Sequence, residues 1–153
     1  MPFENVYHIG VVVEDIEASM RQVADQVGVT WAGRRTATVT VRQDGRIAPI
    51  SLEVCYSRNG PPFIELIEGQ GNGVWSAAGG TRLHHIGIYV EDLAAETARL
   101  TKLGMTSEAL GVGADPADLA PSLFSYMTSP FGVRLELVDA AGRDGLRAWT
   151  SGS

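Results

Sequence analysis

The sequence predicts an α+β protein of two tandem modules, each running strand, helix, strand, strand, strand. The main observation is an internal repeat: residues 7–16 return as residues 84–93, so that His85 follows His8 by 77 residues. A second, shorter echo lies late in each copy, where residues 63–68 resemble residues 133–138. Duplicated units of this kind bury their apolar faces against each other, so we expect one shared core.

A Gly-rich stretch separates the two copies. Residues 69–80 contain five glycines and show no apolar periodicity, which is typical of a connection between modules. The predicted organisation is one domain overall, with a first βαβββ module at 1–68, a linker at 69–82, a second βαβββ module at 83–139 and a flexible tail at 140–153.

The elements of the first module follow from local patterns. Residues 6–13 are apolar and β-branched, as in a buried strand. Asp15 can cap a helix over 16–27, which Gly28 ends. The hairpin turn at Asp44-Gly45 and the turn at 57–62 separate three further strands. These strands are predicted at 36–42, 47–56 and 63–67.

The second module repeats this order less clearly. A strand at 83–90 precedes a helix over 92–103, which Gly104 ends. Residues 105–122 predict a loop around one poorly defined strand. Strands at 123–128 and 133–138 follow. The remaining tail is predicted to be loosely held, although Trp149 suggests that it docks on the domain.

Composition excludes several classes of function. A hydrophobic fraction of 44% without an apolar run of membrane-spanning length predicts a soluble globular protein with no membrane partner. The net charge of −6, without clustered basic residues, argues against nucleic acid. The start of the chain lacks the pattern of a secretory signal, and the single cysteine, Cys55, cannot form an internal disulfide. We therefore expect a cytoplasmic protein.

Four residues at matching positions predict a metal site. Alternate strand residues share a face, so His8 and Glu65 in the first module correspond to His85 and Glu136 in the second. A carboxylate in an apolar strand is costly to bury unless it is paired or bound to metal. Two imidazoles and two carboxylates suit a divalent cation. In both copies a glycine stands two residues after the histidine, which leaves space where we expect a ligand to fit.

Taken singly, these residues have simpler explanations. A single histidine in a core is usually there to make hydrogen bonds, and a single carboxylate in a strand usually reaches solvent. The occurrence of both at matching positions of the repeat favours metal binding instead. Strand alternation turns His84 toward the helix-covered face, which predicts a structural role. Packing or surface roles are predicted for Trp31, Trp75, Trp149, Arg58, Arg134 and Cys55.

The sequence resembles the vicinal oxygen chelate superfamily, which includes glyoxalase I, methylmalonyl-CoA epimerase, extradiol dioxygenases and bleomycin resistance proteins. The resemblance covers residues 6–139 and rests on the segments 8–10, 63–67, 84–87 and 132–137. It implies a cupped mixed sheet around one divalent ion, Zn, Ni, Co, Mn or Fe, with helices on the outer face. The matched positions are His8, Glu65, His85 and Glu136.

The resemblance also implies a reaction class. The full ligand set favours an enzyme of the glyoxalase or epimerase branch over a drug-binding protein, which is the alternative, and the histidine count disfavours a dioxygenase. The expected chemistry is isomerisation, epimerisation or lyase chemistry through a metal-stabilised enolate or enediolate of a small substrate with carbonyl or vicinal oxygens. Glu136 and Glu65 are the candidate catalytic bases. A homodimer is implied as well.

Overall fold

The structure, a computed structural model that describes residues 3–113, 115 and 117–152, contains two successive sets of elements in the order strand, helix, strand, strand, strand, here called the first and second modules. Each module contributes four strands to one curved mixed sheet and one helix beside it. This arrangement confirms the predicted fold class. The first module comprises η1 (Phe3–Asn5), β1 (Val6–Val13), α1 (Ile16–Val27), β2 (Arg35–Gln43), β3 (Arg46–Tyr56) and β4 (Phe63–Glu68). The second comprises β5 (Arg82–Val90), α2 (Leu93–Lys102), β6 (Thr106–Val112), β7 (Pro121–Thr128) and β8 (Arg134–Asp139), followed by η2 (Ala140–Gly142) and α3 (Arg143–Ser151).

The curved sheet closes into a barrel in the order β1-β4-β3-β2-β6-β7-β8-β5. The first and last strands of each module pair in parallel, β1 with β4 and β5 with β8, and the modules meet where β1 runs antiparallel to β5. The opposite edges of the cup, β2 and β6, meet over residues 41–43 and 109–111. The predicted cup is therefore a closed ring, and the poorly readable segment supplies the strand that closes it.

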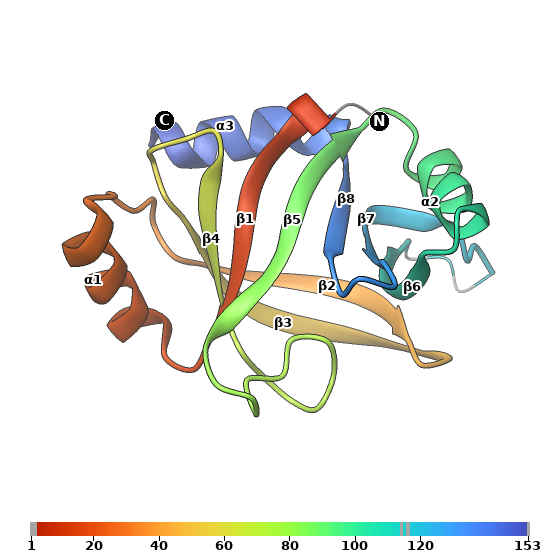
Figure 1. Cartoon of the computed structure of the whole chain (residues 1–153), viewed down its shortest axis with the longest axis horizontal. Coiled ribbons are helices and arrows are strands. Elements are labelled where there is room, and N and C mark those ends of the chain that lie inside the picture. The colour runs from red at the N-terminus through yellow and green to blue at the C-terminus, as the bar shows by residue number, and fades with distance from the viewer. Residues whose placement is uncertain (1–2, 114, 116, 153) are drawn as a thin grey trace.

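The two module helices begin at equivalent capping residues and cover the outside of the barrel (Figure 1). The Asp15 carboxylate accepts a hydrogen bond from Ala18 N, and the Asp92 carboxylate accepts one from Ala95 N. Helix α1 packs Ile16 against Leu66, and α2 packs Leu93 and Leu100 in a cluster with Leu137. Leu66 and Leu137 flank Glu65 and Glu136 in sequence, so the outer face of β4 and β8 is apolar, as the alternation predicted.

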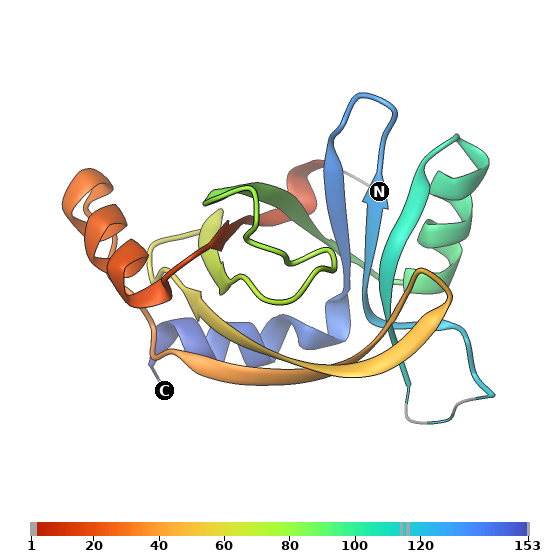
Figure 2. The same ribbon diagram turned by 90° about the horizontal axis from the view of Figure 1, so that it is seen from below.

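The barrel interior is apolar around its polar centre. Both ends of the barrel are covered (Figure 1). The loop over residues 69–80 covers one end, and Figure 2 shows this loop within the ring of strands. Val74 and Trp75 are buried there, and Trp75 Nε1 donates a hydrogen bond to the Tyr126 hydroxyl at 3.1 Å. The predicted linker therefore also packs into the core.

Helix α3 crosses the other end of the barrel, so the predicted flexible tail is wrong for residues 143–151 (Figure 1). Trp149 anchors the helix, because its Nε1 donates to Gly33 O at 2.7 Å and its ring lies 5.0 Å from that of Tyr56. Arg58 donates a hydrogen bond to Thr150 O at 3.1 Å. The sequence pattern misses this helix because its contacts are made with distant residues of the first module. Within the part of the chain described, no helix has the length and apolar character needed to cross a membrane.

Candidate metal centre

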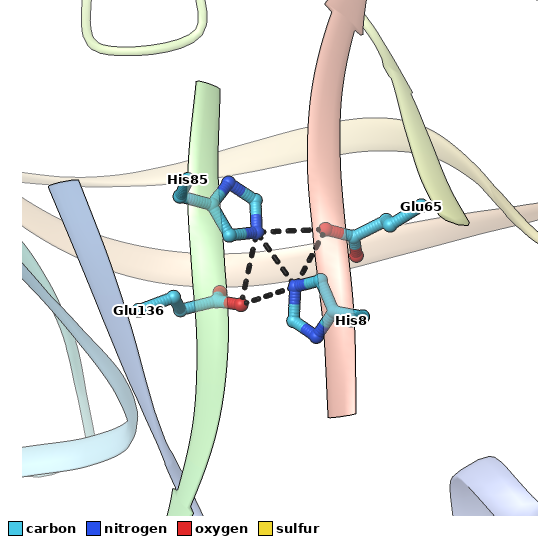
Figure 3. A group of neighbouring side chains, drawn as sticks. All are labelled: His8, Glu65, His85 and Glu136. Atoms are coloured by element: carbon cyan, nitrogen blue, oxygen red, sulfur yellow. Dashed lines mark hydrogen bonds and ion pairs between the residues drawn. The ribbon is translucent and has the colours of Figure 1, made fainter. Parts of the chain in front are cut away.

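The four predicted ligands converge inside the barrel, one from each of β1, β4, β5 and β8 (Figure 3). One donor atom from each residue lies within 4.8 Å of the other three, in a group that could hold a metal ion. His8 Nε2 lies 3.2 Å from Glu65 Oε2 and 3.0 Å from Glu136 Oε2. His85 Nε2 lies 3.0 and 3.2 Å from the same two oxygens, and the two Nε2 atoms are 2.7 Å apart.

Strand register explains this convergence. Gly10 is paired with Glu65 on one side and with His85 on the other, while Gly87 is paired with His8 and Glu136. Each glycine therefore stands between two of the four side chains. A Cβ on Gly10 would overlap the His85 imidazole, and a Cβ on Gly87 would overlap that of His8. We expected a bound ligand in the space beside each glycine. The structure places the histidine of the other module there: His85 beside Gly10, and His8 beside Gly87.

The donor set fits a divalent cation. Two donor atoms that each lie about 2.1 Å from one cation, at right angles, are about 3.0 Å apart. The five measured separations run from 2.7 to 3.2 Å and so match this spacing. Glu65 Oε2 is buried without a hydrogen-bond partner in the described residues, although it faces both imidazoles. A buried carboxylate oxygen of this kind needs a cation or a proton beside it.

The charged groups of the centre shift one another's pKa values in the metal-free protein. Burial alone would lower the pKa of His85, but attraction to Glu136 and the close contacts of its Nε2 with both carboxylates raise it to about 9. Burial alone would raise the pKa of Glu65, but the neighbouring His8 imidazole holds it well below its ordinary value. Burial also opposes ionisation of Glu136, whose pKa His85 nevertheless lowers. The two carboxylates therefore stay ionised and favour positive charge between them.

These shifts predict how the stability of the metal-free protein depends on pH. Because the folded state raises the pKa of His85 from 6.5 to about 9, its stabilising contribution is complete below pH 6.5 and is lost as the pH rises toward 9. In the presence of a chelator we expect the free energy of unfolding to fall over this range, by on the order of 1 to 3 kcal/mol.

Thermal unfolding at pH 6.5, 7.5 and 9 measures this effect, and a His85→Gln variant is the control that should show a smaller decrease. A saturating divalent metal should remove the decrease, because the cation replaces the proton. A melting temperature in chelator that stays level or rises toward pH 9 would contradict the assignment of charge.

The two carboxylates have different surroundings. The Tyr56 hydroxyl donates a hydrogen bond of 2.5 Å to Glu65 Oε1, so both oxygens of Glu65 are in contact with neighbours. Tyr126 is the partner of Glu136 in strand register, but its hydroxyl accepts from Trp75. The Glu136 side chain is also the more exposed, at 12% against 8% for Glu65. Sequence reasoning missed Tyr56 because the register of β3 and β4 cannot be read across the turn between them.

The predicted direction of the His84 side chain is wrong. The strand pairing shifts between Gly10 and Val11, which face His85 and Leu83, so His84 is an additional residue in β5. A β-bulge of this kind breaks the alternation of faces. His84 Nδ1 lies 2.8 Å from His85 Nδ1, and its ring packs 5.4 Å from that of Tyr126 in the barrel interior. It does not face a helix.

The other candidates have structural contacts. Trp31 Nε1 donates to Met20 O, and Cys55 is buried in the core beside α1. Arg58 donates to the backbone of Trp31 and Thr150, and Arg134 pairs with Glu108 at 2.5 Å. These contacts agree with the predicted packing and surface roles.

Comparison with known proteins agrees with the fold. The family model described as glyoxalase/bleomycin resistance protein/dioxygenase superfamily matches residues 7–120. No curated protein sequence matches the chain.

Among solved structures, a variant of the Streptomyces coelicolor methylmalonyl-CoA epimerase in complex with 2-nitronate-propionyl-CoA has a TM-score of 0.58 at 17% identity, covering 90% of this chain and 97% of its own. The methylmalonyl-CoA epimerase of Mycobacterium tuberculosis has a TM-score of 0.57 at 18% identity, covering 93% and 91%. A hypothetical protein from Bacillus halodurans gives 0.57 at 18%, covering 88% and 92%. At these identities the likeness extends to the fold alone.

Proposed function

Because the chain belongs to the glyoxalase/bleomycin resistance protein/dioxygenase superfamily, we propose that it is a divalent-metal-dependent enzyme that moves a proton next to a carbonyl group. The reaction is an isomerisation, an epimerisation or a lyase step on a small carbonyl or acyl substrate. The observation that carries this proposal is the convergence of four donor atoms from His8, Glu65, His85 and Glu136. The acyl-CoA bound by the epimerase relative makes methylmalonyl-CoA the first substrate to test.

A bound divalent cation would act as a Lewis acid that stabilises the negative charge developing on the substrate oxygen. Glu136 is the residue we assign as the base that removes the adjacent proton. Glu65 is less free to move, because Tyr56 holds its Oε1 while its Oε2 faces both imidazoles. The Glu136 side chain is also slightly more exposed than that of Glu65, which favours it as the residue that meets the substrate.

A pocket beside α3 offers space for the rest of the substrate. Its volume is about 310 Å³, and its walls include Tyr7 and Phe63 from the barrel and Leu146 from α3. The Tyr7 ring lies 4.4 Å from the His8 ring, so a residue that lines this pocket also contacts a residue of the centre. A substrate that enters here would approach the four ligands from the α3 end of the barrel.

Metal analysis tests the proposal directly. Protein purified without added metal is expected to contain about one equivalent of Fe, Mn, Co, Ni or Zn, removable by a chelator. The His8→Ala variant should lose this metal, because it lacks the imidazole that contacts both carboxylates in the wild-type protein. Elemental analysis of the two proteins provides the measurement.

Glu53→Gln is the matched control, since Glu53 is a strand carboxylate whose contacts with Thr36 and Arg34 lie outside the centre. It should keep its metal. A wild-type protein that takes up no metal but binds drug-like or aromatic ligands would contradict the enzyme and favour a binding protein.

A further inference from the structure

The histidine beside the centre makes two contacts that fix where its protons lie. His84 is 4% exposed, with Nε2 2.8 Å from Val74 O and Nδ1 2.8 Å from His85 Nδ1. A carbonyl oxygen only accepts hydrogen bonds, so His84 Nε2 must carry a proton and donate it to Val74. Burial favours the neutral imidazole, which has a single ring proton. His84 Nδ1 is then an acceptor.

The proton positions in His85 follow from this contact. Since His84 Nδ1 accepts, His85 Nδ1 must carry the proton of the hydrogen bond between them. The lone pair available to a cation is then on His85 Nε2, the atom that faces Glu65 and Glu136. A chain of two hydrogen bonds therefore runs from a carbonyl in the loop to the ring that faces the centre.

We propose that His84 is a positioning residue for the metal centre, which fixes the tautomer and the ring orientation of His85 through its link to Val74 O. This role rests on the proposed metal-dependent function. A histidine that binds metal is commonly held by a hydrogen bond from its second ring nitrogen to a carboxylate, a carbonyl or a water molecule. Here a second imidazole makes that bond, and it transmits the position of the loop at residues 69–80.

The loop holds the Val74 carbonyl in place through contacts on both sides of it. Val74 N donates to Gln43 Oε1 at 3.3 Å, and the next residue, Trp75, donates to the Tyr126 hydroxyl. The connection between the two modules thus orients one side chain of the centre. We expect this dependence for His85 and not for His8.

The corresponding position in the first module shows the difference. Tyr7 precedes His8 as His84 precedes His85, and it too lies at a shift in the pairing of β1 and β5. Its ring, however, stacks on Tyr89 at 3.7 Å. His8 Nδ1 has no hydrogen-bond partner within the described residues. The chain of two hydrogen bonds that ends at the metal-facing histidine is therefore found in the second module and not at the equivalent position of the first. The sequence repeat alone does not predict this difference.

Cobalt(II) binding to the wild-type protein and to three variants tests the role of His84. In His84→Phe a phenyl ring replaces the imidazole and cannot accept a hydrogen bond, so His85 Nδ1–H is left buried and unpaired. We expect cobalt affinity to fall roughly 10-fold to 100-fold, measured by calorimetry and by the visible absorption of bound cobalt. In His84→Asn the side-chain oxygen can take the place of Nδ1, which should restore part of the affinity. Leu100→Met, a volume-conserving change in the apolar cluster beside α2 and away from the centre, should bind cobalt like the wild type.

A measurement on the metal-free wild-type protein needs no variant. Long-range ¹H–¹⁵N spectra of the histidine rings should show His84 protonated at Nε2 and not at Nδ1, and His85 protonated at Nδ1. The opposite tautomer of His84 would overturn the proposal, whatever the variants do.

The outcomes separate this role from the function on which it rests. If the wild-type protein binds no cobalt, the metal centre fails, and the role of His84 fails with it. If the wild type binds cobalt and His84→Phe, folded by circular dichroism, binds it equally well, the metal centre stands and only the role of His84 is overturned.

Discussion

Replacing Glu136 by Gln is expected to abolish turnover while leaving the fold and the bound metal largely intact. Glutamine has nearly the same shape, and its amide oxygen can still face His8 and His85, but the amide cannot take up a proton at neutral pH. Loss of a general base costs roughly 100-fold to 10,000-fold in rate. Deuterium incorporation from D₂O next to the thioester carbonyl of methylmalonyl-CoA measures proton removal itself, independently of the final product.

The matched variant is Glu65→Gln, at the other carboxylate. Tyr56 can still donate to an amide oxygen at this position, so we expect a folded protein with weaker metal binding. Its rate of deuterium incorporation per bound metal should stay well above that of Glu136→Gln. If Glu65→Gln were inactive and Glu136→Gln active, the base would have to be Glu65. If both variants kept the wild-type rate, neither carboxylate would be the base.

The four residues of the centre were predictable because two regularities agree on them. The repeat aligns His8 with His85 and Glu65 with Glu136, and the alternation of strand residues puts each on the face opposite the apolar helix contacts. Neither regularity depends on knowing how the strands pair. The sequence therefore identifies the four residues, although it does not predict the strand register that brings them together.

What the sequence did not reveal depends on register and on distant contacts. The bulge in β5 reverses the predicted direction of His84, and no residue type in the sequence marks it. Closure of the barrel rests on three residue pairs between β2 and β6, which belong to different modules. Helix α3 is held by contacts of Trp149 with Gly33 and Tyr56, more than ninety residues earlier in the chain.

The second large effect is expected from a single methyl group on Gly87. The Cβ of an alanine at this position would overlap the His8 imidazole. The backbone cannot easily move away, because Gly87 is paired with β1 on one side and β8 on the other, and His8 is fully buried. The imidazole must therefore leave the position in which it contacts Glu65 and Glu136. We expect metal affinity to fall by at least about 100-fold and the metal-free protein to lose about 1 to 3 kcal/mol of stability.

Metal titration and thermal unfolding in chelator measure the two effects separately, and two further glycine variants show whether the cause is local. Gly10→Ala should act in the same way through the His85 imidazole. Gly79→Ala places its methyl group in open space and should match the wild type in both measurements. Gly10 lies against His85, and Gly87 lies against His8. Equal losses of metal affinity in Gly10→Ala and Gly87→Ala would mean that metal binding needs both imidazoles in their positions beside the carboxylates. Wild-type metal affinity in Gly87→Ala would mean instead that His8 can leave the cluster without loss of binding, and His8 would then no longer count among the ligands.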